Sequence, residues 1–164
     1  MTLAHPEIRL IIQDTAVPAN VHFQLAKTAD CRTLFDLGFS RQTFPQFRET
    51  CDRLLAWQAN DRCCWLVARH ANAIIGSGQL ILYPHGSELA NMFVAPPFRS
   101  QGIGTAMVTI LTAVARKWGV RNLEISVAAS NTRAATLYRR LGFSHDRHIK
   151  LSNQEAARVL WKEL

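Results

Sequence analysis

A strand followed by a double-proline stop and a glycine-containing turn is the feature that most constrains the fold. The apolar strand 88–94 is followed by Pro96 and Pro97, and Gly102 and Gly104 then open a long amphipathic helix. Glycines let the backbone run close to a bound group, and the free N–H groups of a first helical turn attract an anion. The segment therefore predicts an anion site between a strand and a helix, and a pyrophosphate fits it best.

Two well-known anion-binding turns are excluded by spacing. A dinucleotide fingerprint needs a third small residue where this chain has Met107, and a P-loop needs a Gly-Lys-Ser/Thr sequence that is absent. A bare Gly-x-Gly also occurs at ordinary helix starts, so the rest of the chain has to decide what this turn binds.

Hydrophobic periodicity places the other elements along the chain. Alternating or continuous apolar runs predict strands at 21–25, 64–68, 73–83, 88–94, 123–127, 144–151 and 157–162. Apolar residues at helical spacing predict helices carrying Cys31, Leu34 and Phe35, then over 44–59, 102–118 and 131–141. Short turns make the strands 64–94 antiparallel neighbours, and a helical crossover makes 123–127 parallel to 88–94.

The N-terminal segment is harder to place. Its apolar run Ile8–Ile12 is compatible with a short strand, framed by Pro6 and Pro18 as a lead-in segment. We therefore expect residues 1–19 to be an N-terminal extension and residues 20–164 to form a single domain. A length of 164 residues with 48% apolar and 19% charged residues fits one globular domain better than two.

Charge, cysteines and hydropathy narrow the classes of partner. The net charge of +7 favours an anionic partner, whether nucleic acid, acidic lipid or a phosphorylated small molecule. No aromatic-basic recognition pattern supports nucleic acid, and no apolar run approaches the roughly 20 residues of a membrane span. The four cysteines and six histidines show no convincing metal-ligand spacing, so we expect reduced thiols, no metal and a cytoplasmic protein.

Two motifs together indicate a family. Arg99–Gly104 resembles the acyl-CoA signature Gln/Arg-x-x-Gly-x-Gly/Ala of the GNAT superfamily of N-acetyltransferases. Asn131–Phe143 resembles the Asn-x-x-Ala-x-x-x-Tyr-x-x-x-Gly-Phe helix of the same family, and the two motifs lie within residues 88–143. The resemblance implies an α/β fold with a mixed, mostly antiparallel sheet of about seven strands, flanked by about four helices. In that fold the parallel strands near 88–94 and 122–128 splay apart.

The resemblance also implies acetyl-CoA as co-substrate and assigns residues to it. The main chain of three strand residues would hold the pantetheine arm: Met92, Phe93 and Val94. The turn and the first helical residues would cradle the pyrophosphate: Arg99, Ser100, Gln101, Gly102, Ile103, Gly104 and Thr105. Asn131 would hydrogen-bond the arm from the other side. The basic residues Arg133, Arg139, Arg140 and Lys150 either reach a 3′-phosphate or form a solvated surface.

Two residues are catalytic candidates. Tyr138 lies two helical turns after Asn131, and a phenol of pKa ~10 can protonate a thiolate whose thiol has pKa ~8.5. Spacing alone favours a core aromatic whose hydroxyl bonds to backbone, and the family match makes Tyr138 the general acid. Glu88 is the candidate base, acting through ordered water or after its pKa is raised by burial. Other relatives use a glutamate on the following strand, at the position that Ser126 holds here. Glu124, two residues earlier on the same face, and water alone remain alternatives.

The resemblance implies transfer of an acetyl group to a primary amine of a small molecule, peptide or protein by direct attack in a ternary complex. A catalytically silent acyl-CoA-binding sensor is the alternative, and the presence of Tyr138 argues against it. The acceptor groove is expected among residues 27–60 and 144–164, where no motif names the amine. Homodimers are common among similar proteins, and the sequence leaves the oligomeric state open.

Overall fold

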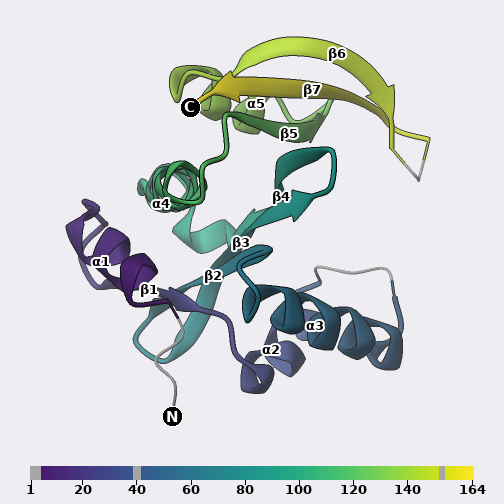
Figure 1. The fold of residues 1–164 in the computed structure, drawn as a ribbon. Helices are drawn as coiled ribbons and strands as arrows, with labels where there is room; N and C mark the ends of the chain where they lie inside the picture. Colours follow the sequence, from purple (N-terminus) through teal and green to yellow (C-terminus); the bar gives the residue numbers. More distant parts are fainter. Residues whose placement is uncertain (1–4, 39–41, 152–153) are drawn as a thin grey trace.

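The computed structural model describes residues 5–38, 42–151 and 154–164, and Figure 1 shows their arrangement. The α-helices are α1 (Pro6–Asp14), α2 (Cys31–Asp36), α3 (Phe44–Gln58), α4 (Ile103–Lys117) and α5 (Thr132–Arg140). The strands are β1 (Val21–Leu25), β2 (Cys63–His70), β3 (Ala73–Tyr83), β4 (Gly86–Val94), β5 (Asn122–Ala128), β6 (Ser144–Lys150) and β7 (Ala156–Glu163). Short 3₁₀ turns cover Thr28–Asp30 and Pro96–Phe98.

The seven strands form one sheet in the order β1-β2-β3-β4-β5-β7-β6. Strands β4 and β5 are parallel, and every other neighbouring pair in the sheet is antiparallel. Tight turns join the antiparallel strands β2 to β4, whereas the parallel pair needs the crossover through α4. The mixed, mostly antiparallel fold expected from the sequence is confirmed, as is the parallel pair.

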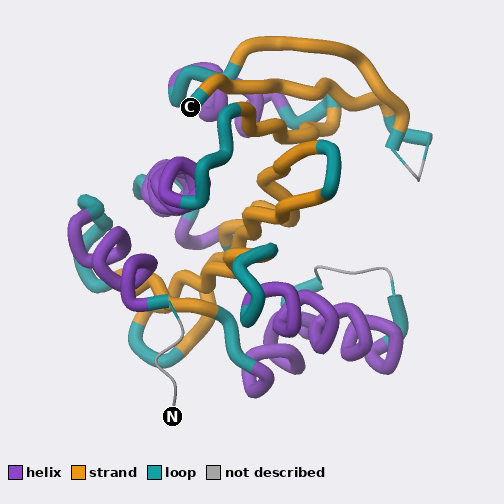
Figure 2. The backbone as a smooth tube through the Cα atoms, in the orientation of Figure 1, coloured by secondary structure: helices purple, strands orange, loops and turns teal. Residues whose placement is uncertain are grey.

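Helices cover both faces of the sheet, and the strand β2 shows why. Its alternate residues Cys64, Leu66 and Ala68 belong to the core beneath α4, while Trp65 and Val67 belong to the core beneath α2 and α3. A strand that is buried on both faces reads as a continuous apolar run rather than an alternating one. Figures 1 and 2 show α1 and α4 on one side of the sheet and α2 and α3 on the other.

The N-terminal segment, for which the sequence allowed a short strand, is a helix instead, so the described residues contain five α-helices where about four were expected. Pro6 occupies the first turn of α1, where its missing N–H removes no helical hydrogen bond. Ile8 is fully buried, Ile11 and Ile12 pack against the same core, and Leu10 is 59% exposed. This spacing is that of a helix with one apolar side, and α1 packs against α4.

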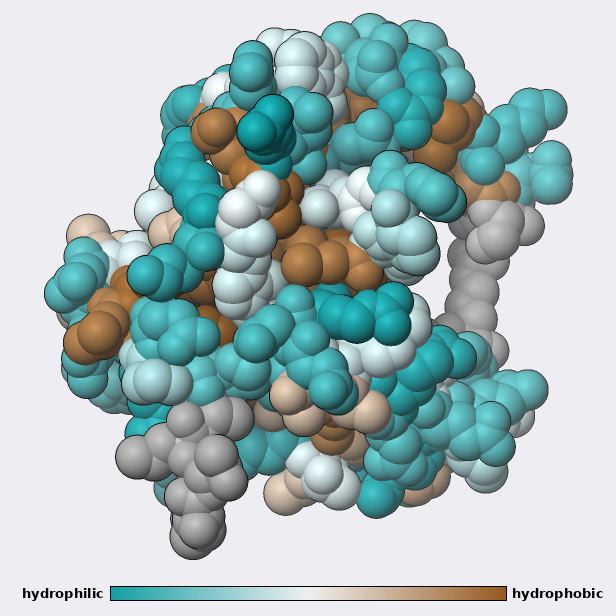
Figure 3. Space-filling view, in the orientation of Figure 1, coloured by the Kyte–Doolittle hydropathy of each residue, from teal (hydrophilic) through white to brown (hydrophobic). Residues whose placement is uncertain are grey.

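The surface seen in Figure 3 is largely hydrophilic, with apolar side chains gathered near the centre of this face. None of the helices in the described ranges is long and apolar enough to cross a membrane.

Candidate functional site

The parallel strands β4 and β5 are paired over a short stretch only. Their register joins Glu88 with Glu124 and Leu89 with Ile125 and then ends. Beyond this point β4 carries one extra residue relative to β3, and Asn91 at the irregularity has a φ of 51°. An inserted residue of this kind bends a strand and re-aims its backbone. The splayed parallel pair expected from the sequence is therefore confirmed, and an open strand edge begins at the irregularity.

A pocket of about 760 Å³ lies where the strands separate. It is bounded by the end of β4, the turn that follows it, the start of α4 and one face of α5. Eleven of the predicted site residues line it: Met92, Phe93, Val94, Arg99, Ser100, Gly102, Ile103, Gly104, Thr105, Asn131 and Tyr138. Of the other two, Gln101 donates its side-chain amide to the carbonyl of Pro97 outside the lining, and Glu88 lies in a neighbouring pocket.

The turn before α4 has the backbone geometry of an anion-binding loop. Ser100 and Gly102 both have positive φ values, of 62° and 85°, and no side chain caps the helix at Gly102. The first N–H groups of a helix lack intrahelical partners, so those of α4 face the pocket mouth without a protein cap. Arg99 is fixed in the turn, because its Nε donates to the carbonyl oxygen of Val94 at 2.9 Å.

Two arginines on α5 complete the wall of this pocket, and both belong to the basic set for which the sequence left a phosphate contact or a solvated surface open. Arg133 donates to Ser100 Oγ, and Arg140 donates to Thr105 Oγ1 at 3.3 Å. No acidic residue lines the pocket among the residues that the structure describes. Helical spacing could have predicted that these arginines lie together, because positions 133, 137 and 140 share one side of α5. All three line the pocket. Arg139 and Lys150 do not line it.

Tyr138 lies at the inner end of the pocket. It is 5% exposed and its ring packs edge-on against Phe143. Its hydroxyl forms no hydrogen bond with any residue in the described part of the chain, so the backbone partner expected of a purely structural tyrosine is not found there. Burial raises the pKa of Tyr138 to about 12, which keeps the phenol protonated at physiological pH.

A second pocket, of about 340 Å³, adjoins the first on the far side of Tyr138. Four residues line both pockets: Met92, Asn131, Ala134 and Tyr138. Asn131 caps α5, with its Oδ1 accepting from the N–H of Ala134 at 3.1 Å, and this contact orients the side chain at the junction. A group bound in the larger pocket can therefore meet one in the smaller pocket beside the Tyr138 hydroxyl.

Glu88 is the one acidic residue among the described residues that line the smaller pocket. Its pKa is raised, first by burial and then by the neighbouring carboxylate of Glu124. Glu124 itself lies outside the lining and is held by Arg147, whose two terminal nitrogens donate to its oxygens at 3.0 and 3.1 Å. Ser126 lines the pocket on the β5 side. The geometry thus favours Glu88 over Glu124 as the carboxylate that reaches a bound group.

The segments expected to surround the acceptor contribute less than the sequence suggested. No described residue of 27–60 or 144–164 lines either pocket. Residues 39–41 and 152–153, which fall inside those ranges, lie outside the described part of the chain.

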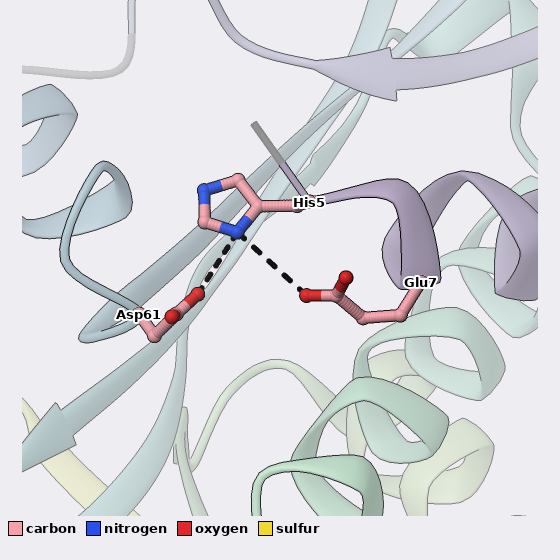
Figure 4. Close-up of side chains that lie close together, drawn as sticks. All are labelled: His5, Glu7 and Asp61. Atoms are coloured by element: carbon pink, nitrogen blue, oxygen red, sulfur yellow. Dashed lines mark ion pairs between the residues drawn. The ribbon is translucent and has the colours of Figure 1, made fainter. Parts of the chain in front are cut away.

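A separate polar cluster joins the start of α1 to the turn before β2. His5 Nδ1 lies 2.9 Å from Asp61 Oδ1 and 3.8 Å from Glu7 Oε1 (Figure 4). The three side chains are close enough to hold a metal ion, yet none of them lines either pocket. The contact between His5 and Asp61 joins the residue before α1 to the turn between α3 and β2.

The fold thus places an uncapped helix start and three arginines along an open strand edge, beside a second pocket. A model of the acetyltransferase (GNAT) family matches residues 30–143, more than two thirds of the chain. The chain therefore belongs to this family.

Two curated relatives are similar to parts of the chain. An uncharacterised N-acetyltransferase of Methanocaldococcus jannaschii is 39% identical over 64 residues, which cover 39% of this chain and 28% of the relative. An uncharacterised protein of Bacillus subtilis is 24% identical over 95 residues, 58% of each chain. The matches thus span less than two thirds of either relative's own length.

Solved structures share the fold over nearly the whole chain. The acetyltransferase of Salmonella typhimurium that modifies the N-terminal serine of ribosomal protein L7/L12 superposes with a TM-score of 0.75 at 14% identity, covering 92% of this chain and 98% of that one. A ribosomal L7/L12 α-N-protein acetyltransferase in complex with coenzyme A gives 0.76 at 13% identity, covering 92% and 97%. At such identities the likeness shows the fold.

Proposed function

We propose that this protein is an N-acetyltransferase that transfers an acetyl group from acetyl-CoA to a primary amine by direct attack in a ternary complex. The observation that carries the proposal is the meeting of the two pockets at Tyr138 and Met92, where β4 and β5 separate. One pocket has room and charge for a phosphorylated donor, and the other presents a carboxylate to an acceptor.

The larger pocket fits coenzyme A by its chemistry. The uncapped turn at Gly102 and the arginines Arg133 and Arg140 suit a polyanion, because backbone N–H groups and guanidinium groups both bind phosphate oxygens. The open edge of β4 at Met92–Val94 suits an extended chain that pairs with backbone as an added strand. Gln101 would contribute through its main chain, since its side chain is turned to Pro97.

The chain's own residues supply the remaining functions. Acetyl-CoA, when bound, brings an activated acyl group and a thiolate leaving group. A backbone N–H of β4 beyond Asn91 would polarise the acyl carbonyl, as preorganised donors do. Glu88, with its raised pKa, would take a proton from the ammonium acceptor through water. Tyr138 would hold the proton that the departing sulfur requires.

The acceptor class and the cellular setting belong to the same proposal. The solved structures with this fold include the L7/L12 serine acetyltransferase and a chimeric spermidine N-acetyltransferase from Vibrio cholerae, so protein N-termini and polyamines are the first acceptors to try. The free, buried thiols of Cys31, Cys51, Cys63 and Cys64 support a reducing cytoplasm. We also propose that nucleic acid is no partner and that a homodimer is compatible with the fold.

Binding and turnover test the proposal separately. Acetyl-CoA at a hundredfold excess over its dissociation constant should raise the free energy of unfolding by ~2.7 kcal/mol. A thiol-release screen with amino acids, polyamines, aminoglycosides and peptide N-termini should then find an acceptor that consumes acetyl-CoA. Binding without release on any amine would identify the acyl-CoA-binding sensor instead, and no thermal shift with acetyl-CoA would refute both functions.

A further inference from the structure

Two glycines of β3 make room for methionine side chains beneath the candidate site. A Cβ added at Gly78 would lie 2.5 Å from Met107 Sδ and 2.6 Å from Met92 Sδ. A Cβ added at Gly76 would lie 3.3 Å from Met107 Cε and 3.0 Å from the carbonyl oxygen of Phe93. Real Cβ atoms do not approach other atoms as closely as 2.5 Å. The two glycines therefore form a shallow trough in the sheet, and the thioether of Met107 lies in it.

These methionines also line the pockets. Met107 is fully buried on α4 and lines the larger pocket, and Met92 lines both pockets at their junction with Tyr138. In a transfer between the two pockets, the acyl group has to lie at this junction. Met92 lies at this junction, and Met107, which lines the larger pocket only, lies beside it, since both sulfur atoms lie over Gly78.

We propose that Met107, lying in the trough between Gly76 and Gly78, sets the length of the acyl group and restricts the pocket to acetyl. The inference rests on the proposed function and extends it to donor specificity. A longer acyl chain extends toward Met107 and has to displace a side chain that fills its space completely. Close-packed interiors resist such a displacement, because neighbouring atoms have nowhere to move.

The same geometry predicts opposite effects for two substitutions. Replacing Met107 with alanine removes the thioether and leaves a cavity that is continuous with the pocket, so a longer chain gains buried contacts there. Replacing Gly78 with alanine pushes both sulfur atoms off the strand and toward the pocket, which narrows it. Methionine is flexible enough to make this shift without unfolding the chain.

Equilibrium binding tests the inference without a known acceptor. Calorimetric titration with CoA, acetyl-CoA, propionyl-CoA and butyryl-CoA gives, for each acyl group, the affinity relative to free CoA in the same protein. The natural chain should bind acetyl-CoA more tightly than butyryl-CoA. Met107→Ala should raise the ratio of butyryl-CoA to acetyl-CoA affinity by about tenfold, the factor expected from burying two methylenes. Gly78→Ala should lower this ratio below the value of the natural chain.

Leu111→Ala is the matched control, because Leu111 is fully buried on the same helix and lines neither pocket. It should lower stability without changing the order of acyl-CoA affinities. If Met107→Ala binds CoA normally and keeps the preference for acetyl, the role of Met107 is wrong while the proposed function stands. If the natural chain binds neither CoA nor any acyl-CoA, the proposed function fails and the inference fails with it.

Discussion

The two pockets share a wall but carry opposite charges. The larger one is lined by Arg99, Arg133 and Arg140 and by no acidic residue of the described chain, whereas the smaller is lined by Glu88 and by no basic one. Tyr138 stands between them with a phenol that stays neutral up to high pH. In the proposed function, this difference would separate a polyanionic donor from a cationic acceptor within one opening of the sheet. The following substitutions test the two sides of the wall in turn.

Removing the hydroxyl of Tyr138 should have the largest effect, because Tyr138 lines both pockets and its hydroxyl is the proposed proton donor. Tyr138→Phe should lower kcat by roughly 10²- to 10⁴-fold, the range for a positioned general acid, in a thiol-release assay with the acceptor found by screening. The ring and its contact with Phe143 remain, so the calorimetric affinity for acetyl-CoA should stay unchanged. Full turnover in this variant would exclude Tyr138 as the acid.

In the smaller pocket, removing the Glu88 carboxylate should lower the rate by a smaller factor than removing the Tyr138 hydroxyl. Glu88→Gln should lower kcat/KM by about 10²-fold, since water at the pocket mouth can partly replace the base. The affinity for acetyl-CoA, which is bound across the wall, should not change. Glu49→Gln is the control, because Glu49 is an exposed carboxylate of α3 that lines neither pocket. Equal losses in the two variants would show that general surface charge is responsible.

On the donor side, each arginine of α5 should affect binding only. Arg133→Ala and Arg140→Ala should each weaken acetyl-CoA binding by about tenfold, because each removes a charge-assisted contact to phosphate. The loss should shrink at high salt, where screening weakens these contacts in the natural chain. Arg139→Ala removes the same charge from the same helix outside the pocket, so it should bind nearly normally. Indistinguishable affinities in the three variants would contradict the assignment.

Local patterns were sufficient to predict most of this fold. The turn from Arg99 to Gly104 sits between a strand and a helix as expected, and Asn131 caps α5. Both features are predictable because backbone turns and helix caps are determined by residues that lie close together in the sequence. The apolar run Ile8–Ile12 could not be assigned from the sequence, since four apolar residues in five fit either a strand or one side of a helix. In the structure this segment is the helix α1, which packs its apolar side against α4.

The parts of the site that could not be predicted depend on distant segments. The irregularity at Asn91 exists because β3 and β4 differ by one residue across their pairing, and no single strand reveals this. The sequence named Arg133 but left open whether it reaches a phosphate or a solvated surface, and it lines the pocket because α5 lies beside the turn at Ser100, 33 residues earlier. Likewise, Gly78 in β3 looks like a weak strand position until Met107 of α4 fills the space above it.

The smallest effect should come from the ion pair between Arg147 and Glu124 beside the smaller pocket. It should change the pH range over which Glu88 is deprotonated and kcat/KM is high. A base has to be deprotonated, so kcat/KM should fall as the pH is lowered through the raised pKa of Glu88. Glu124→Gln removes a neighbouring negative charge and should move this acid limb to lower pH. Arg147→Gln leaves Glu124 without its cation and should move the limb to higher pH.

Both shifts should be small even at low ionic strength, because Arg147 and Glu124 are each close to half exposed and solvent screens them. They should shrink in high salt, and the double variant Glu124→Gln with Arg147→Gln should move the limb less than Glu124→Gln alone. Profiles of kcat/KM against pH for the four proteins provide the measurement. Two single variants that shift the limb in the same direction would show that Glu124 does not act on Glu88 through its charge, and the acceptor pocket would then owe its acidity to Glu88 alone.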